Sequence, residues 1–570
     1  MGDRLSDQPG ERSSRLKAMG VPALVAAMAG ALVLLFQIRL GAYTAELGYD
    51  ECSHYVSGLL IHDYLATGLG QSPLKYLRDF GSAYPLVGIG HWGPFWYGIE
   101  AFWMFLFGWS RTALMAFSAL TTVVIAVLLY RTVAKPLGWV LALFAALAFV
   151  CSPITQVSSA AIMLDGAITL ICFLAALAWQ RYTRTLDYRY SIAFGALASM
   201  GLLIKGNAAC LALIPPLFLL LERNWSIMKR KSFWIPVVMV LVIAGPWTAI
   251  SYHQVSQGFR FGWGWPYTSV AVPENAGIMM RAFGPLLLAF AALGLAPLFR
   301  RNAEDAKSLD IRALAALGAA MLGAVLLFQC IVPAAIQDRY LEPSLPPLFI
   351  LAAVGIRQLA ARPIPSLALA SLVIVAALPW ITSAEIKRQF DLKVAVEQVW
   401  QHRLADNPSV LILSDGGAEG AAVAEIAMHD KARPSMFAVR GSRLLGGGGY
   451  NSQEYQPRFQ DPRQALAAID QYAIPLVLIR RERGRDEWAH VAQIDDARAL
   501  EPQRWRVLYR KLTPTTSVTL YQLTGNDAQK INVEKLKQLT GPRALQSSNL
   551  SAYPRQLARN FSARAPQPQF

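Results

Sequence analysis

The sequence predicts a polytopic α-helical membrane protein with about eleven transmembrane helices, followed by a C-terminal soluble α/β domain. Of the 570 residues, 54% are hydrophobic and only 16% are charged. Apolar stretches of membrane-spanning length recur from residue 21 to about residue 380. Beyond that point, short strand patterns alternate with helical patterns, as in soluble α/β domains.

The transmembrane segments are predicted from apolar runs with polar flanks. They cover residues 19–40, 111–130, 138–153, 166–180, 191–204, 207–221, 233–250, 276–298, 311–332, 344–360 and 363–383. With residues 1–18 as a retained cytoplasmic tail, the basic loops all lie inside, as the positive-inside rule requires. The net charge of +16 agrees with basic cytoplasmic loops near anionic lipid, and no nucleic-acid partner is needed to explain it.

Residues 41–110 are predicted to form one long outer loop within a transmembrane domain that spans 19–383. The stretch 91–109 is apolar and rich in tryptophan, but counting it as a full span would place all later basic loops outside. We therefore interpret it as an interfacial or re-entrant helix. A loop of about 70 residues greatly exceeds the usual connection length, which indicates a functional role.

Residues 384–525 are predicted to fold as an α/β domain on the outer face. Apolar runs predict strands at 410–414, 435–439 and 475–479, a hairpin at 505–512 and 517–523, and helices at 421–428 and 462–472. Residues 526–570 form a basic tail that we expect to be partly disordered, with a short helix at 533–539. The five cysteines are scattered and indicate no disulfide framework or paired metal motif.

Asp50 and Glu51 are adjacent acidic residues just outside the first apolar run. Two carboxylates at the mouth of a membrane segment are costly to place and suggest chemistry at the bilayer surface, with a solvated loop as the alternative. Neighbouring residues point in different directions on a helix or a strand, so these two cannot form a tight dyad. We expect one to act as a general base for an acceptor hydroxyl or amine while the other positions it.

His54 follows the acidic pair by three or four positions, and His62 and Asp63 come two turns later. If the segment is helical, this spacing permits a metal site or a phosphate clasp. The candidate ligands of a divalent cation are His54, Glu51 and His91. The alternative is that interfacial histidines are simply solvated.

Three further charged residues lie on the same predicted face. Asp165 stands at the outer start of an apolar helix, where it either caps the helix or acts as a second catalytic carboxylate. Lys205 and Arg339 lie at outer helix ends, on the side that is normally poor in basic residues. An anionic lipid phosphate explains both cations, and snorkelling to ordinary headgroups is the alternative.

These residues belong to a set of motifs that follow one another along the chain. The motifs are Asp50-Glu51, His-Trp-Gly-Pro-Phe-Trp96 with Leu-Phe-Gly-Trp-Ser110, Met-Leu-Asp165, Gly-Leu-Leu-Ile-Lys-Gly206, and Arg339-Tyr-Leu-Glu-Pro-Ser-Leu-Pro-Pro347. Over residues 20–360 the ordered set resembles the GT-C glycosyltransferases. More narrowly, it is similar to the bacterial protein mannosyltransferase and aminoarabinose (lipid A) transferase group.

The resemblance implies an enzyme of the bacterial inner membrane that transfers a hexose or pentose with inversion. The sugar would move from a polyprenyl-phosphate donor to a lipid, glycan or protein acceptor on the periplasmic side. Asp50 would be the base, Asp165 its partner carboxylate and Glu51 a third catalytic candidate, while Lys205 and Arg339 would contact the donor phosphate. The other candidates for binding donor phosphate or sugar are Tyr340, His91, His54, Tyr55, Arg260, Trp263 and Trp265.

Two departures from the family pattern concern specificity. Aminoarabinose transferases commonly show Glu-Lys-Pro-Pro where this chain has Gly90-His-Trp-Gly-Pro94, so the expected lysine is missing and His91, Lys75 or Arg78 would replace it. The arginine often found after the acidic pair is also absent. Lipid A specificity is therefore not carried over from the resemblance.

Other interpretations remain open for some features. The aromatic loop 259–267, which contains Arg260, Trp263 and Trp265, suits a sugar ring, but an interfacial aromatic belt explains it too. A transporter or flippase of lipid-linked sugars is the alternative function, although such proteins place ionisable groups near the midplane and often show duplicated halves. A membrane anchor for the α/β domain would leave the charged motifs unexplained.

Overall fold

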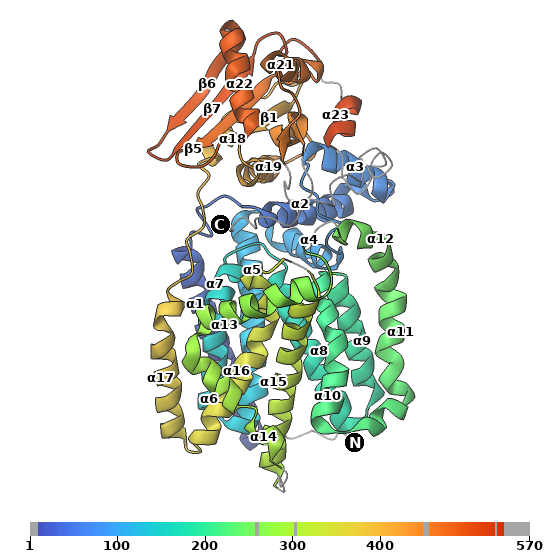
Figure 1. Cartoon of the computed structure of the whole chain (residues 1–570), viewed down its shortest axis with the longest axis vertical. Coiled ribbons are helices and arrows are strands. Elements are labelled where there is room, and N and C mark those ends of the chain that lie inside the picture. Colours follow the sequence, from blue (N-terminus) through green and yellow to red (C-terminus); the bar gives the residue numbers. More distant parts are fainter. Residues whose placement is uncertain are drawn as a thin grey trace, which may run out of the picture.

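The apolar segments form a helical membrane part, and an α/β domain covers one end of it (Figure 1). The computed structural model describes residues 9–256, 261–300, 305–333, 335–447, 455–530 and 533–540. The helices of the membrane part are α1 (Pro9–Arg39), α5 (Arg111–Leu137), α6 (Trp139–Cys151), α7 (Pro153–Ser159), α8 (Asp165–Thr185), α9 (Tyr188–Leu202), α10 (Ile214–Glu222), α11 (Lys231–Ile243), α12 (Gly245–Ser256), α13 (Trp265–Leu293), α14 (Ala296–Phe299), α15 (Ala306–Ile331), α16 (Leu345–Leu359) and α17 (Pro363–Ile381).

The chain is a multi-pass membrane protein. Within the described residues, five helices are long and apolar enough to cross a membrane, or up to seven if each of two bent pairs counts as one span. The number of eleven spans therefore stays a prediction. Helix α1 already begins at Pro9, so part of the expected cytoplasmic tail is helical.

Proline and glycine break several of the predicted spans. The pair α6 and α7 bends by 60° where Pro153 follows Cys151 and Ser152, and the pair α11 and α12 bends by 59° near Gly245-Pro246. The predicted span 207–221 begins as a 3-10 helix, η2 (Gly206–Leu213), ahead of α10. Proline lacks a backbone N–H and clashes with the preceding turn, which accounts for breaks at these positions.

The first outer loop forms helices that lie across the end of the membrane part (Figure 1). They are α2 (Asp50–Asp63), α3 (Pro73–Ala83) and α4 (Phe95–Phe107), with the π-helical turn η1 (Tyr64–Gly68) after α2. Helix α4 has only 13 residues, whereas a span needs about 20. Its length and position are those expected of an interfacial helix.

The C-terminal part contains a five-stranded sheet with the order β2-β1-β5-β7-β6. Strand β1 pairs in parallel with β2 and β5, and β7 pairs antiparallel with β5 and β6. The strands are β1 (Ser409–Leu413), β2 (Phe437–Arg440), β5 (Leu476–Glu482), β6 (Trp505–Leu512) and β7 (Thr516–Leu523), beside a small ladder of β3 (Gly446–Gly447) and β4 (Gln456–Pro457). The helices are α18 (Lys393–Gln401), α19 (Gly416–His429), α20 (Gly441–Leu444), α21 (Pro462–Gln471), α22 (Ala489–Leu500) and α23 (Val533–Thr540).

Each strand and helix predicted for this domain is present within a few residues of its expected bounds. Helices α18, α20 and α22 were not expected. The predicted short helix of the tail is α23, which packs against α3, and most of the remaining tail lies outside the described residues.

The α/β domain is joined to the outer-loop helices by a shared core and by ion pairs. One cluster of buried apolar side chains contains Tyr55 and Leu59 of α2 together with Ala422 of α19. Arg433 binds Asp63 at the end of α2, with an Nε–Oδ2 distance of 2.6 Å, and Arg111 binds Glu425. The sheet and the first outer loop therefore form one packed unit.

Candidate functional site

Asp50 is the first residue of α2, and its carboxylate is paired with a residue that lies 289 positions later in the chain. The Arg339 guanidinium donates from Nη2 to Asp50 Oδ2 at 2.6 Å. Arg339 begins the segment ahead of α16, in the 3-10 helix η4 (Asp338–Ser344), and its Nε donates to Gln337 Oε1 at 2.7 Å. The structure thus brings together two of the residues that the sequence placed on one face.

Asp165 and Lys205 form a second ion pair. Lys205 Nζ donates to Asp165 Oδ1 at 2.6 Å, and both side chains are buried, at 8% and 3% exposure. Asp165 is the first residue of α8, but its Oδ1 accepts from Lys205 and its Oδ2 has no hydrogen-bond partner among the described residues. It holds Lys205 rather than its own helix terminus.

Tyr340 lies between the two pairs. Its ring centroid is 4.5 Å from Lys205 Nζ and 5.3 Å from Arg339 Cζ, distances at which a cation is attracted to an aromatic face. The predicted residues Asp50, Asp165, Lys205, Arg339 and Tyr340 therefore form one cluster, to which α2, α8, η4 and the segment after α9 contribute.

A close backbone approach holds Lys205 near the outer loop. Gly93 N donates to Ile204 O at 3.1 Å, immediately before Lys205. A Cβ at Gly93 would lie 2.0 Å from the Leu203 carbonyl oxygen, so only glycine fits there. The Gly-Pro motif after His91 therefore positions the lysine segment.

The cluster favours an ionised Asp50. Burial would raise the pKa of Asp50, but the positive charges of Arg339 and Lys205 outweigh burial and hold the pKa below its ordinary value. Burial would likewise lower the pKa of Arg339, whereas Asp165 and Asp50 raise it. Both partners are therefore charged at neutral pH.

His54 and His91 lie beside this cluster as neutral imidazoles. Burial lowers the pKa of His54 to about 3 and that of His91 to about 4, although the Asp50 charge acts in the opposite direction on both. The His54 ring centroid is 4.3 Å from that of Trp92, and its Nδ1 lies 2.8 Å from the Tyr97 hydroxyl. The His91 ring contacts the edge of Trp92 at 4.7 Å.

The predicted metal site is not assembled. Among the residues that the structure describes, no group of three His, Cys, Asp or Glu side chains is placed to hold a metal ion. Glu51 is directed instead toward Lys387, because consecutive helical residues point to different sides. The expectation that His54, Glu51 and His91 share a cation is wrong in this structure.

Two other candidates are engaged in structural contacts. Glu51 Oε1 accepts from Lys387 Nζ at 2.6 Å and from the backbone N–H of Ile162 at 3.1 Å. Tyr55 is buried, and its hydroxyl donates to the Trp109 carbonyl at 2.8 Å. Neither side chain is turned toward the Asp50–Arg339 pair.

The candidates in the aromatic loop stand at the surface. Trp263 and Trp265 are 58% and 77% exposed at the start of α13, and Arg260 lies outside the described residues. Lys75 and Arg78 are exposed on α3, a helix that contacts β2 and α23. Among the proposed substitutes for the missing lysine, His91 lies close enough to the cluster that the charges of Asp50 and Lys205 affect its pKa.

Comparisons with known proteins bear on this arrangement. Residues 93–250 match the family model for dolichyl-phosphate-mannose-protein mannosyltransferase. The crystal structure of ArnT from Cupriavidus metallidurans bound to undecaprenyl phosphate is 15% identical and superposes with a TM-score of 0.59, covering 90% of this chain and 99% of that one. The same protein in the apo state gives 0.55 at 15% identity, with the same two coverages. This chain therefore has the same fold as ArnT.

A weaker likeness involves the apo Archaeoglobus fulgidus oligosaccharyltransferase, with 13% identity and a TM-score of 0.49, covering 80% of this chain and 69% of that one. No curated protein matches the sequence. The GT-C resemblance predicted from the ordered motifs is confirmed. The family match contains Asp165 and Lys205, whereas Asp50 and Arg339 lie outside it.

Two buried carboxyls near the charged cluster, Glu342 and Glu100, were not predicted as site residues from the sequence. Glu342, three residues after Arg339, accepts from the Ser158 hydroxyl at 2.8 Å, and burial and the Asp165 charge raise its pKa to about 8. Glu100 of α4 is buried, and burial raises its pKa well above the ordinary value. Glu342 belongs to the Arg339-Tyr-Leu-Glu-Pro motif, which could have indicated a role for it. Glu100 lies in an apolar run, where nothing in the sequence marks it as a site residue.

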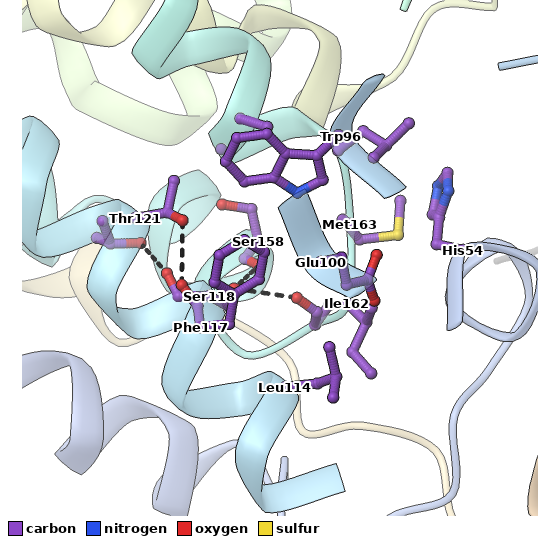
Figure 2. A pocket seen from close by; sticks show the side chains of 15 residues that line it. His54, Trp96, Glu100, Leu114, Phe117, Ser118, Thr121, Ser158, Ile162 and Met163 are labelled. Carbon is purple, nitrogen blue, oxygen red and sulfur yellow. Dashed lines mark hydrogen bonds between the residues drawn. The ribbon is translucent and has the colours of Figure 1, made fainter. Parts of the chain in front are cut away.

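Ser158 and Glu100 line a small pocket between the outer-loop helices and α5 (Figure 2). In Figure 2, His54 and Glu100 lie toward one side of the pocket and Ser118 and Thr121 toward the other. The pocket has about 20 Å³ of water-accessible volume, which is room for one or two waters. A volume of this size does not hold a sugar.

Proposed function

We propose that this protein is a membrane glycosyltransferase that moves a sugar from a polyprenyl-phosphate donor to an extracytoplasmic acceptor, with inversion. The observation that carries the proposal is the cluster in which two carboxylates and two cations converge around Tyr340 at the end of the helical part. The undecaprenyl phosphate bound to ArnT, which has the same fold, supports a lipid phosphate as the leaving group.

The chemistry needs both signs of charge. The acceptor oxygen attacks the anomeric carbon while the bond between that carbon and the phosphate oxygen breaks, and the electron pair of this bond goes to the phosphate. Arg339 and Lys205 stabilise the charge that develops there. Asp50 takes the acceptor proton as general base, and attack opposite to the leaving group inverts the anomeric carbon.

Arg339 links donor binding to the state of the base. Arg339 donates to Asp50 at 2.6 Å, and a donor phosphate would compete for the same guanidinium. Once Arg339 turns to the phosphate, Asp50 loses the contact that lowers its pKa and becomes a stronger base. Donor binding thereby prepares the acceptor reaction.

The proposed topology puts the cluster and the α/β domain on the periplasmic side of a bacterial inner membrane. The basic loops of the sequence support this orientation, as does the position of α2, α3 and α4 between the helices and the sheet (Figure 1). The acceptor is a lipid, glycan or protein. A flippase remains the alternative function, but the paired charges lie at one end of the helices rather than near the middle of the bundle.

Asp50→Asn tests the function. In membranes of a deletion strain, mass spectrometry of lipids and surface glycans identifies the product that the purified wild type restores. The variant should form this product roughly 10²- to 10⁴-fold more slowly, yet bind undecaprenyl phosphate at least as tightly, because Arg339 is released from its competitor.

Asp310→Asn is the matched control. Asp310 is as exposed as Asp50, at 33%, and is also paired with an arginine, Arg184, at 3.1 Å. It lies near the start of α15, whereas Arg339 and Tyr340 of the cluster follow the other end of that helix, and its variant should keep the wild-type rate. Full activity of Asp50→Asn, or a deletion strain with unchanged glycans and lipids, would overturn the proposal.

A further inference from the structure

The segment between α17 and α18 runs beside the start of α2 and makes contacts that the proposed reaction does not explain. The backbone N–H of Lys387 donates to the Leu40 carbonyl at 2.9 Å. The Glu46 carboxylate accepts from the backbone N–H groups of Phe390 and Leu392 at 2.9 and 2.8 Å. A segment more than 330 positions later is thus bound along residues 40–51.

Lys387 binds the residue that follows Asp50. Its Nζ donates to Glu51 Oε1 at 2.6 Å and to the Ala160 carbonyl at 3.3 Å. The same Glu51 oxygen accepts from the N–H of Ile162, and Oε2 accepts from the N–H of Gly48 at 3.2 Å. This junction ties the start of α2 to the segment just ahead of Asp165.

Arg388 binds the residue that precedes Asp50. Its Nη1 donates to the Tyr49 hydroxyl at 3.3 Å, and its Nη2 donates to Asp415 at 2.9 Å and to Glu482. Asp415 and Glu482 stand at the carboxyl ends of β1 and β5. Arg388 therefore links Tyr49 to the sheet of the α/β domain.

Tyr49 has a backbone conformation that needs such support. Its φ is 47° and its ψ is −120°, a strained region that a bulky residue rarely adopts. Its ring also packs closely on α19, since a Cβ at Gly417 would lie 3.2 Å from it. Without these contacts the chain would relax at the residue next to Asp50.

We infer that Lys387 and Arg388 are positioning residues that hold Asp50 by fixing Tyr49 and Glu51, so that the α/β domain sets the geometry of the base. The inference rests on the proposed role of Asp50. A displacement of about 1 Å at a reacting group costs roughly 10²-fold in rate. Lys387 and Arg388, which we call the clamp, act on the rate of transfer. The proposed phosphate contacts, Lys205 and Arg339, are on other segments.

Lys387→Met is the primary test, and Lys387→Arg is its conservative partner. We expect Lys387→Met to lower the initial transfer rate in deletion-strain membranes by about 10- to 100-fold, with the Kd for undecaprenyl phosphate unchanged within about twofold. Lys387→Arg keeps the charge and should stay within a few fold of wild type. Hydrogen exchange of residues 44–52 should be faster in Lys387→Met only.

Two further variants keep the test decisive. If Lys387→Met fails to fold because Glu51 is left with an unpaired charge, Glu51→Gln/Lys387→Met removes that charge and should fold with the same low rate. Lys511→Met is the matched control, because Lys511 binds the same linker through Asp391 at 2.9 Å, while among the described residues no hydrogen bond or ion pair joins it to residues 40–51. It should transfer at the wild-type rate.

The outcomes separate this inference from the proposed function. A folded Lys387→Met protein with the wild-type rate and unchanged exchange at 44–52 would overturn the clamp, as would an equal loss in Lys511→Met. If Asp50→Asn is fully active while Lys387→Met shows faster exchange at 44–52, the clamp exists but the role of Asp50 as base is wrong.

Discussion

Removing Lys205 alone should show how much of the Lys205–Asp165 pair serves stability and how much serves the reaction. Both side chains are buried, the Nζ–Oδ1 distance is 2.6 Å, and Asp165 Oδ2 has no hydrogen-bond partner among the described residues. Lys205→Met preserves length but removes the cation that is hydrogen-bonded to the buried Asp165 carboxylate. Breaking a buried pair from one side costs about 3–5 kcal/mol.

The double variant Lys205→Met/Asp165→Asn removes both charges and should cost far less, about 1–3 kcal/mol for the remaining unsatisfied amide. Thermal unfolding in detergent can be followed with a thiol-reactive dye, because Cys52, Cys172 and Cys210 are buried and free. We expect the lowest midpoint for Lys205→Met and a midpoint near wild type for the double variant.

Binding of undecaprenyl phosphate should not follow the thermal midpoint among these variants. A charged hydrogen bond to the donor phosphate is worth about 1.5–3 kcal/mol, so both variants should bind undecaprenyl phosphate roughly 10- to 100-fold more weakly. If Lys205→Met is as stable as wild type, the pair is not buried as described. If the double variant regains wild-type binding, Lys205 does not contact the phosphate.

Two further predictions concern pH. Arg339→Met should move the acid limb of the pH–rate profile, measured at low substrate, toward higher pH. The reason is that Arg339 lowers the pKa of Asp50 against the effect of burial. An acid limb that does not move would contradict Asp50 as the titrating base. Glu342 has a folded-state pKa raised from 4.5 to about 8, so its contribution to stability is complete below pH 4.5 and is lost as pH rises toward 8. Between pH 5 and 8 the thermal midpoint of wild type should therefore fall relative to that of Glu342→Gln, and parallel pH curves for the two proteins would argue against a protonated Glu342.

The membership of the charged cluster could be predicted from the sequence because a single physical rule places it. Once the basic loops are assigned to one side, Asp50, Asp165, Lys205 and Arg339 are left together on the other. The strands of the α/β domain could also be predicted from the sequence, because the buried strands β1 and β5 are short apolar runs between turns. Both inferences depend on local composition and its sidedness.

The pairing within the cluster could not be predicted, because it depends on tertiary contacts. Nothing in the sequence indicates that Asp50 binds Arg339 while Asp165 binds Lys205, or that Glu51 turns to Lys387. The metal site predicted from His54, Glu51 and His91 was wrong for the same reason. Helical spacing relates His54 to the acidic pair, but it does not give the position of His91. Lys387 follows the last apolar run, where a basic residue carries no particular signal.

The two ion pairs differ in a way that bears on which carboxylate is the base. A carboxylate partner neutralises each cation of the cluster, because a buried unpaired charge costs several kcal/mol. Asp165 and Lys205 are buried together, whereas the side chains of Asp50 and Arg339 are 33% and 25% exposed. An arriving phosphate therefore displaces Asp50 from Arg339 more readily than it displaces Asp165 from Lys205. This difference in exposure supports the proposal that Asp50 is the base and that Asp165 keeps Lys205 in place.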